Sequence, residues 1–118
     1  MLRTPLNGVV GAAELLAAKD FPQRELVQTL TRKFSGEARH LIDLIEGAVI
    51  GKDRARFQEL THALKGTAMM AGAIGLRNSA ARAEIIADSD FDSVGAGTVE
   101  DLREALEETN HELSRMLA

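Results

Sequence analysis

The spacing of apolar residues constrains the fold of this chain more than any other feature of its sequence. Apolar side chains recur every three or four positions through most of residues 20–118, and no strand-length stretch alternates between apolar and polar residues. The first pattern places apolar groups on one face of an α-helix, whereas alternation is typical of a half-buried strand. The sequence therefore predicts an all-α fold, an antiparallel four-helix bundle whose apolar faces pack together.

Local signals divide this pattern into helices. A first helix spans residues 20–50, Asp53 caps a second whose end is bracketed by Gly72 and Gly75, and a third spans residues 76–87. A fourth helix follows near the C-terminus. The residues predicted to face the core are Val27, Leu30, Phe34, Ala38, Leu41, Ile45 and Val49 in the first helix, Phe57, Leu60, Leu64, Ala68 and Ala71 in the second, Leu76, Ala80, Ala83 and Ala87 in the third, and Val99, Leu102, Leu106, Thr109, Leu113 and Met116 in the fourth.

The segments outside the first three helices are assigned from composition. Residues 88–97 are rich in Asp, Ser and Gly and are predicted to form a loop, after which Thr98 and Asp101 form a capping box at the start of the fourth helix. Residues 1–19 are predicted to form an additional N-terminal helical segment. A length of 118 residues supports one core, so the whole chain is expected to be a single domain with its bundle in residues 20–118.

Composition excludes several classes of function. The chain has no Cys, which rules out disulfides, thiol catalysis and Cys-ligated metals. A net charge of -4 and the absence of Trp and Tyr argue against nucleic-acid binding. No apolar run approaches the roughly 20 residues that span a membrane, and no secretory signal is visible, so we expect a cytoplasmic protein. His40 and His111 project from different helices than His62, so no metal site is expected.

His62 is the residue that the pattern singles out for chemistry. It lies about 160° around the second helix from the mean direction of the apolar residues and therefore faces water. Gly66 and Met69 continue the same face, and Lys65 stands at its flank. The two candidate roles of Lys65 are to hold a phosphoryl oxygen and to orient the phosphoryl group as a flexible point charge. A neutral imidazole is a good nucleophile near pH 7, and a glycine one turn away opens its approach. These features favour a phosphoryl carrier.

Residues 62–68, His-Ala-Leu-Lys-Gly-Thr-Ala, followed by Ala71-Gly72-Ala73 and Leu76, resemble the signature of histidine-containing phosphotransfer (HPt) domains. The likeness is densest over residues 57–84, and Glu84 falls at a position that the family often fills with Glu or Gln. The resemblance implies a four-helix bundle with His62 as phosphoacceptor and with Lys65 and Gly66 as its immediate surroundings.

The same resemblance implies the partners. Receiver domains of response regulators, including that of a hybrid sensor kinase, would donate and accept the phosphoryl group and would supply the aspartate and the Mg²⁺, so the chain needs no cofactor of its own and has no ATP-dependent kinase activity. The residues expected to meet a receiver are His62, Lys65, Gly66, Met69 and Glu84. Met70 is assigned equally to the core and to the surface.

A second resemblance supports an alternative function. Residues 2–8, Leu-Arg-Thr-Pro-Leu-Asn-Gly, resemble the acceptor box of sensor histidine kinases, but Met1 stands where the histidine would be. Residues 23–45, which include Ser35-Gly36-Glu37, resemble the second helix of a kinase dimerisation hairpin. The alternative is therefore a non-catalytic helical interaction or dimerisation domain derived from a kinase. A monomer is favoured, and a homodimer through the N-terminal helix stays open.

Overall fold

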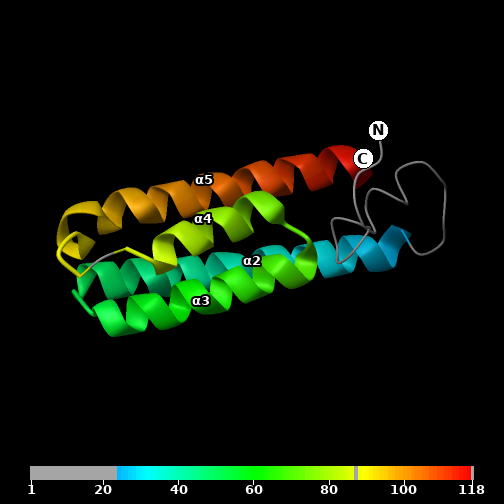
Figure 1. Ribbon diagram of the computed structural model, residues 1–118. Helices are drawn as coiled ribbons and strands as arrows, with labels where there is room; N and C mark the ends of the chain where they lie inside the picture. The colour runs from blue at the N-terminus through cyan, green and yellow to red at the C-terminus, as the bar shows by residue number, and fades with distance from the viewer. Residues whose placement is uncertain (1–23, 87, 118) are drawn as a thin grey trace.

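The computed structural model describes residues 24–86 and 88–117, and over these ranges it contains helices and no strand (Figure 1). The helices are α2 (Arg24–Ile50), α3 (Arg54–Ala71), α4 (Ile74–Glu84) and α5 (Phe91–Leu117). The all-α class predicted from the apolar spacing is confirmed. The N-terminal helical segment predicted for residues 1–19 lies outside the described residues.

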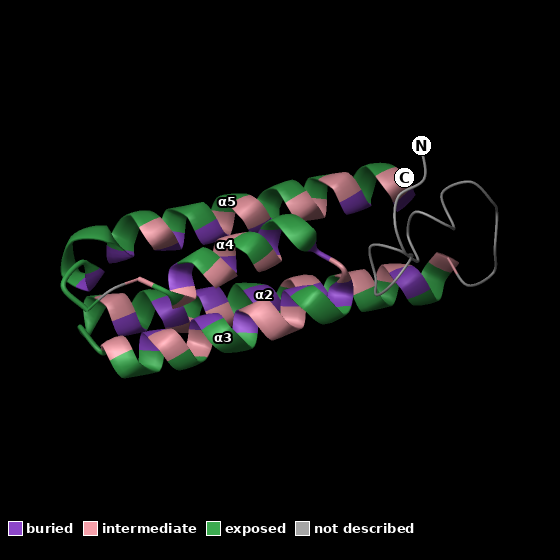
Figure 2. Ribbon diagram, in the orientation of Figure 1, coloured by how far each residue is buried: buried purple, intermediate pink, exposed green. Residues whose placement is uncertain are grey.

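Each described helix packs against two others. Helix α2 contacts α3 and α5, and α4 contacts α3 and α5, so the four helices enclose one core. Figure 2 shows the buried positions along the inward sides of all four helices. The core cluster consists of Phe34, Ala38, Ile42, Ile45, Ala48, Phe57, Leu64, Ala68, Ala71, Ala73, Leu76, Ala80, Ala83, Phe91, Val99, Leu102 and Leu106. This is the helical bundle that the stripes predicted.

Helix α2 buries a different set of residues from its predicted stripe. Ile42 and Ala48 are buried in the core, whereas Leu30 is 42% exposed. Ile42 is buried because α2 has neighbours on two sides, so its buried sector is wider than one stripe. Leu30 points in the same direction as Ala48 but lies about five turns earlier along the helix. Its direction is therefore the one predicted, and its position along α2 accounts for its exposure.

Both ends of α3 follow the predicted signals. The Asp53 carboxylate accepts a hydrogen bond from the backbone N–H of Arg56 at 3.1 Å, as an N-cap does. Gly72 adopts a left-handed φ of 75° beyond the last turn, and its N–H donates to the Met69 carbonyl at 3.1 Å. A side chain would be strained in that conformation. These two caps fix the register of the helix that carries His62.

The predicted loop over residues 88–97 is wrong, because α5 begins at Phe91. Phe91 is buried and its ring meets that of Phe57 edge-on, with the ring centroids 5.0 Å apart. Thr98 donates its hydroxyl to the Val94 carbonyl inside α5 and caps nothing. Helix α4 is also displaced from its predicted range, since it begins at Ile74 and ends at Glu84. Burial of Phe91 outweighs the weak helix propensity of the Gly- and Ser-rich stretch.

Gly95 marks a close approach between α5 and α2. It is buried, and a Cβ at this position would lie 2.9 Å from Cγ1 of Val49. No real Cβ tolerates such a contact, so a side chain there would force the two helices apart or displace Val49. Glycine is therefore required at position 95 by packing rather than by backbone conformation.

We predict that Gly95→Ala lowers the free energy of unfolding by about 1–2 kcal/mol, because the overpacking cost exceeds the gain in helix propensity. Gly97→Ala is the matched control, since a Cβ at Gly97 meets nothing within 4 Å and that position is exposed on the same helix. The control variant should be stabilised by up to about 1 kcal/mol. Urea unfolding of both variants is the measurement, and equal stability would contradict the close contact.

Candidate functional site

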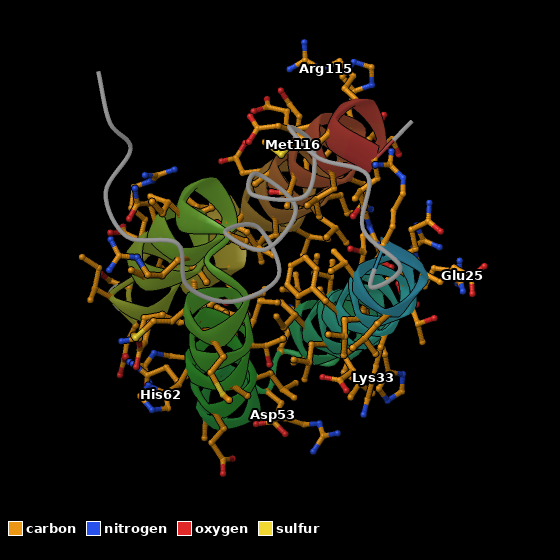
Figure 3. All side chains as sticks on the ribbon, turned by 90° about the vertical axis from the view of Figure 1, so that its right-hand side faces the viewer. Glu25, Lys33, Asp53, His62, Arg115 and Met116 are labelled. Carbon is orange, nitrogen blue, oxygen red and sulfur yellow. The ribbon has the colours of Figure 1, made fainter. Side chains whose placement is uncertain are left out.

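His62 lies on the outer face of α3. The opposite face of the same helix carries Phe57, Leu64 and Ala68, which are all buried in the core. The His62 side chain is 68% exposed, and Figure 3 shows it projecting from the helix into solvent. The face predicted from the helical rotation is therefore the one observed.

Glu84, the last residue of α4, contacts both polar neighbours of the site. Its Oε2 lies 2.7 Å from Nδ1 of His62, and its Oε1 lies 2.7 Å from Nζ of Lys65. The side chains of Lys65 and Glu84 are only 28% and 24% exposed. The Lys65 ammonium group, predicted at the flank of the His62 face, is paired with Glu84 in the structure. One carboxylate thus joins the imidazole and the ammonium group across two helices.

Close packing of α4 on α3 brings Glu84 to His62. Ala80 and Ala83 are buried where α4 meets the core, and their small side chains let the two helices approach closely. The Gln58 side-chain amide donates to the Glu84 backbone carbonyl at 3.3 Å, which ties the C-terminal end of α4 to α3. The sequence pattern indicated that position 84 is often acidic or amide-bearing, but only the packing shows what its side chain contacts.

The charge on Glu84 decides which imidazole nitrogen is available. A hydrogen bond from Lys65 and, secondarily, one from His62 hold the pKa of the Glu84 carboxyl below its ordinary value, against a small opposing effect of burial. Glu84 is therefore ionised near neutral pH, and a carboxylate only accepts hydrogen bonds. Nδ1 of His62 must carry the hydrogen in this contact. In the neutral imidazole, the lone pair is then on Nε2.

The surroundings of His62 are open and partly apolar. A Cβ on Gly66 would meet nothing within 4 Å, so this position leaves free space one turn beyond His62. Met69 is exposed on the same face, and Met70 is 82% exposed, which excludes the core role considered for it. Ile85 is also exposed, and it directly follows Glu84. Sequence reasoning missed Ile85, although it stands out of phase with the buried stripe of α4.

Within residues 24–86 and 88–117, no group of three or more His, Asp or Glu side chains is arranged to hold a metal ion. His40 and His111 are exposed on α2 and α5. Over the same residues, no helix is long and apolar enough to cross a membrane.

The lowered pKa of Glu84 predicts an acid-dependent contribution to stability. A carboxyl whose pKa is lowered by folding stabilises the folded state above its unfolded pKa, near 4.5, and loses this contribution as the pH falls through the folded pKa. Lys65→Met removes the hydrogen bond that contributes most to the lowered pKa of Glu84, so this pKa should rise towards 4.5. A ¹³C NMR titration of the Glu84 carboxyl in both proteins measures this shift, and identical midpoints would contradict the pairing.

Comparison with known proteins agrees with this geometry. A family model described as the Hpt domain matches residues 29–118, which include His62, Lys65 and Glu84. No curated protein and no solved structure matches the chain significantly. Hpt domains act in histidine phosphotransfer in phosphorelays, as phosphoryl carriers rather than kinases, and interact with receiver domains. Because the match covers more than half of the chain, the chain belongs to the Hpt domain family.

Proposed function

We propose that this chain is a histidine phosphotransfer module of a multistep phosphorelay. His62 accepts a phosphoryl group from the aspartate of one receiver domain and passes it to the aspartate of another. The observation that carries the proposal is the exposed imidazole whose Nδ1 is held by Glu84 at 2.7 Å, which leaves Nε2 as the nucleophile. The whole chain is taken as one domain of the antiparallel HPt type, with the bundle in residues 20–118.

The chemical step follows from that arrangement. The Nε2 lone pair attacks the phosphorus of the aspartyl phosphate, an N–P bond forms, and the P–O bond to the aspartate breaks with its electrons leaving on the carboxylate. The hydrogen on Nδ1 stays in place, so positive charge develops on the imidazole ring. The Glu84 carboxylate is already oriented towards that charge and stabilises it. Transfer to the second receiver reverses these steps.

Lys65 acts in this proposal through Glu84. Its ammonium group holds Oε1 of Glu84 at 2.7 Å, so the other oxygen stays directed at Nδ1 of His62. Lys65 is therefore a positioning residue, and its charge also keeps the Glu84 carboxyl ionised. The Mg²⁺ and the reacting aspartate belong to the receiver domain, in keeping with a chain that serves as carrier.

The receiver surface is proposed to surround His62. Open space at Gly66 admits the partner's backbone or side chains, and exposed Met69 offers an apolar contact on the same face. Ile85, which follows Glu84 in the chain and is exposed, offers a second apolar group at the end of α4. Single exposed apolar residues are ordinary, but apolar groups beside a nucleophile suit a docking partner.

The decisive test uses the purified chain, a phosphorylated receiver domain and Mg²⁺. We expect an acid-labile, alkali-stable phosphoryl group that mass spectrometry places on His62. His62→Gln should abolish labelling and change the free energy of unfolding by less than about 0.5 kcal/mol, since the side chain is exposed. His40→Gln, at an exposed histidine of α2, is the matched control and should label normally. Absence of label from competent receivers would favour the alternative interaction or dimerisation domain.

A large side chain at Gly66 should block transfer without unfolding the protein. Gly66→Arg fills the open space beside His62 and should slow transfer at least about tenfold, because a misplaced nucleophile loses its attack geometry. Gly66→Ala is the control and should transfer nearly as fast as the wild type. Single-turnover rates with one receiver measure both, and a normal rate for Gly66→Arg would refute the docking surface.

Removal of the Glu84 charge should slow transfer even where a hydrogen bond survives. Glu84→Gln still offers an oxygen to Nδ1 but lacks the negative charge that stabilises the cationic ring, so we expect the transfer rate to fall about tenfold. Glu84→Ala, which also loses orientation, should be slower again. Rates measured at saturating receiver separate this effect from docking, and equal rates for all three proteins would remove Glu84 from the mechanism.

A further inference from the structure

A groove runs between α2 and α5, on helices other than the two that carry His62 and Glu84. It has a volume of about 390 Å³ and is lined by Arg32, Gly36 and Arg39 on α2 and by Asn110 and Ser114 on α5, together with neighbouring hydroxyl side chains. None of its lining residues is acidic, although the chain has 18 acidic and 14 basic residues. We call this surface the α2–α5 groove.

Gly36 makes a recess between the two arginines. Arg32, Gly36 and Arg39 succeed one another at spacings of four and three residues, so they share one face of α2. A Cβ on Gly36 would meet nothing within 4 Å, so core packing does not require glycine there. Glycine is unfavourable in the middle of a helix, and this position therefore has no structural explanation in the described bundle.

The two guanidinium groups are available to a ligand. Among the described residues, neither Arg32 nor Arg39 has a carboxylate in ion-pair distance, and the polar contact of Arg32 is with the Thr29 hydroxyl at 3.4 Å. By contrast, Arg103 on α5 lies 3.0 Å from both Asp43 and Glu46. The arginines of the groove thus differ from a neighbouring arginine that already has its partners.

The opposite wall of the groove is held in place by a side-chain hydrogen bond. The Asn110 amide on α5 donates to the Ser35 hydroxyl on α2 at 2.9 Å, which joins the two helices at the groove. Ser114 lies one turn beyond Asn110 on the same face of α5. The groove therefore combines two cationic groups on one side with neutral polar groups on the other.

We propose that the α2–α5 groove binds a short acidic segment of a partner protein, whose carboxylates pair with Arg32 and Arg39. Positions seven residues apart on a helix are separated by roughly 10 Å, which suits two carboxylates better than one small anion. Guanidinium groups bind carboxylates through paired hydrogen bonds. A longer polyanion would be repelled by exposed Glu107, which lines a neighbouring pocket together with Arg39.

The α2–α5 groove and His62 lie on different helices. In Figure 3, His62 projects from α3 and Lys33, the neighbour of Arg32 on α2, projects from the other side of the view. The residues that line the groove include neither His62 nor Glu84. The proposal is therefore independent of the phosphotransfer chemistry, and it describes a tether rather than a second reaction site.

The test is an NMR titration of the ¹⁵N-labelled chain with an acetylated, amidated hexaglutamate peptide at low salt. We expect saturable shifts at the Gly36 amide and at the Asn110 side-chain amide. The double variant Arg32→Gln/Arg39→Gln should weaken binding at least about tenfold, since it removes both charge pairs. Gly36→Gln should also abolish binding while leaving the helix at least as stable. Arg56→Gln removes one positive charge from α3, a helix that does not line the groove, and this control should bind normally.

Four outcomes would overturn the proposal. Unchanged affinity in the double variant or in Gly36→Gln would show that the groove is not the site. If Arg56→Gln weakened peptide binding as much as the double variant, net charge rather than the groove would account for the loss of affinity. Inorganic phosphate shifting the same amides as tightly as the peptide would indicate a single-anion site. If sedimentation showed that the wild-type chain self-associates with rising concentration and the double variant does not, the occupant of the groove would be a second copy of the chain.

Discussion

The packing of α3 against α2 and α4 at the same time is the constraint on which the candidate site depends. One side of α3 is buried in the core and carries Phe57, Leu64 and Ala68. Because these residues share one side of the helix, His62 faces the opposite side, towards solvent. The caps at Asp53 and Gly72 set where the helix begins and ends, and hence its register. Burial of apolar surface is therefore what exposes the imidazole.

The second consequence of this packing is the contact between the last residue of α4 and His62. Helix α4 has 11 residues and packs closely through buried alanines. Its last residue, Glu84, therefore contacts His62, which lies 22 positions earlier in the chain. Lys65 is part of the same arrangement, because it satisfies the second oxygen of Glu84 and stabilises its charge. Two charged side chains, Glu84 and Lys65, thus orient the imidazole of His62.

Helix α5 shows how far tertiary burial overrides local preference. Residues 91–97 contain Gly95, Gly97 and Ser93, which locally favour a loop, yet they form the first two turns of α5. Phe91 gains an aromatic contact with Phe57, and Gly95 allows the approach to Val49 that a larger residue would prevent. Such gains exist only once α2, α3 and α5 are assembled, so a local signal could not predict them.

The sequence by itself determined the helical class, the ends of α3, most of the buried stripe and the outward direction of His62, because helical periodicity and capping are local properties. Only the tertiary structure decided that Glu84 joins His62 to Lys65, that Leu30 and Met70 are exposed, and that α5 starts at Phe91. Each of these depends on which helix lies beside the residue and at what level. Periodicity defines a direction around one helix and carries no information on its neighbours.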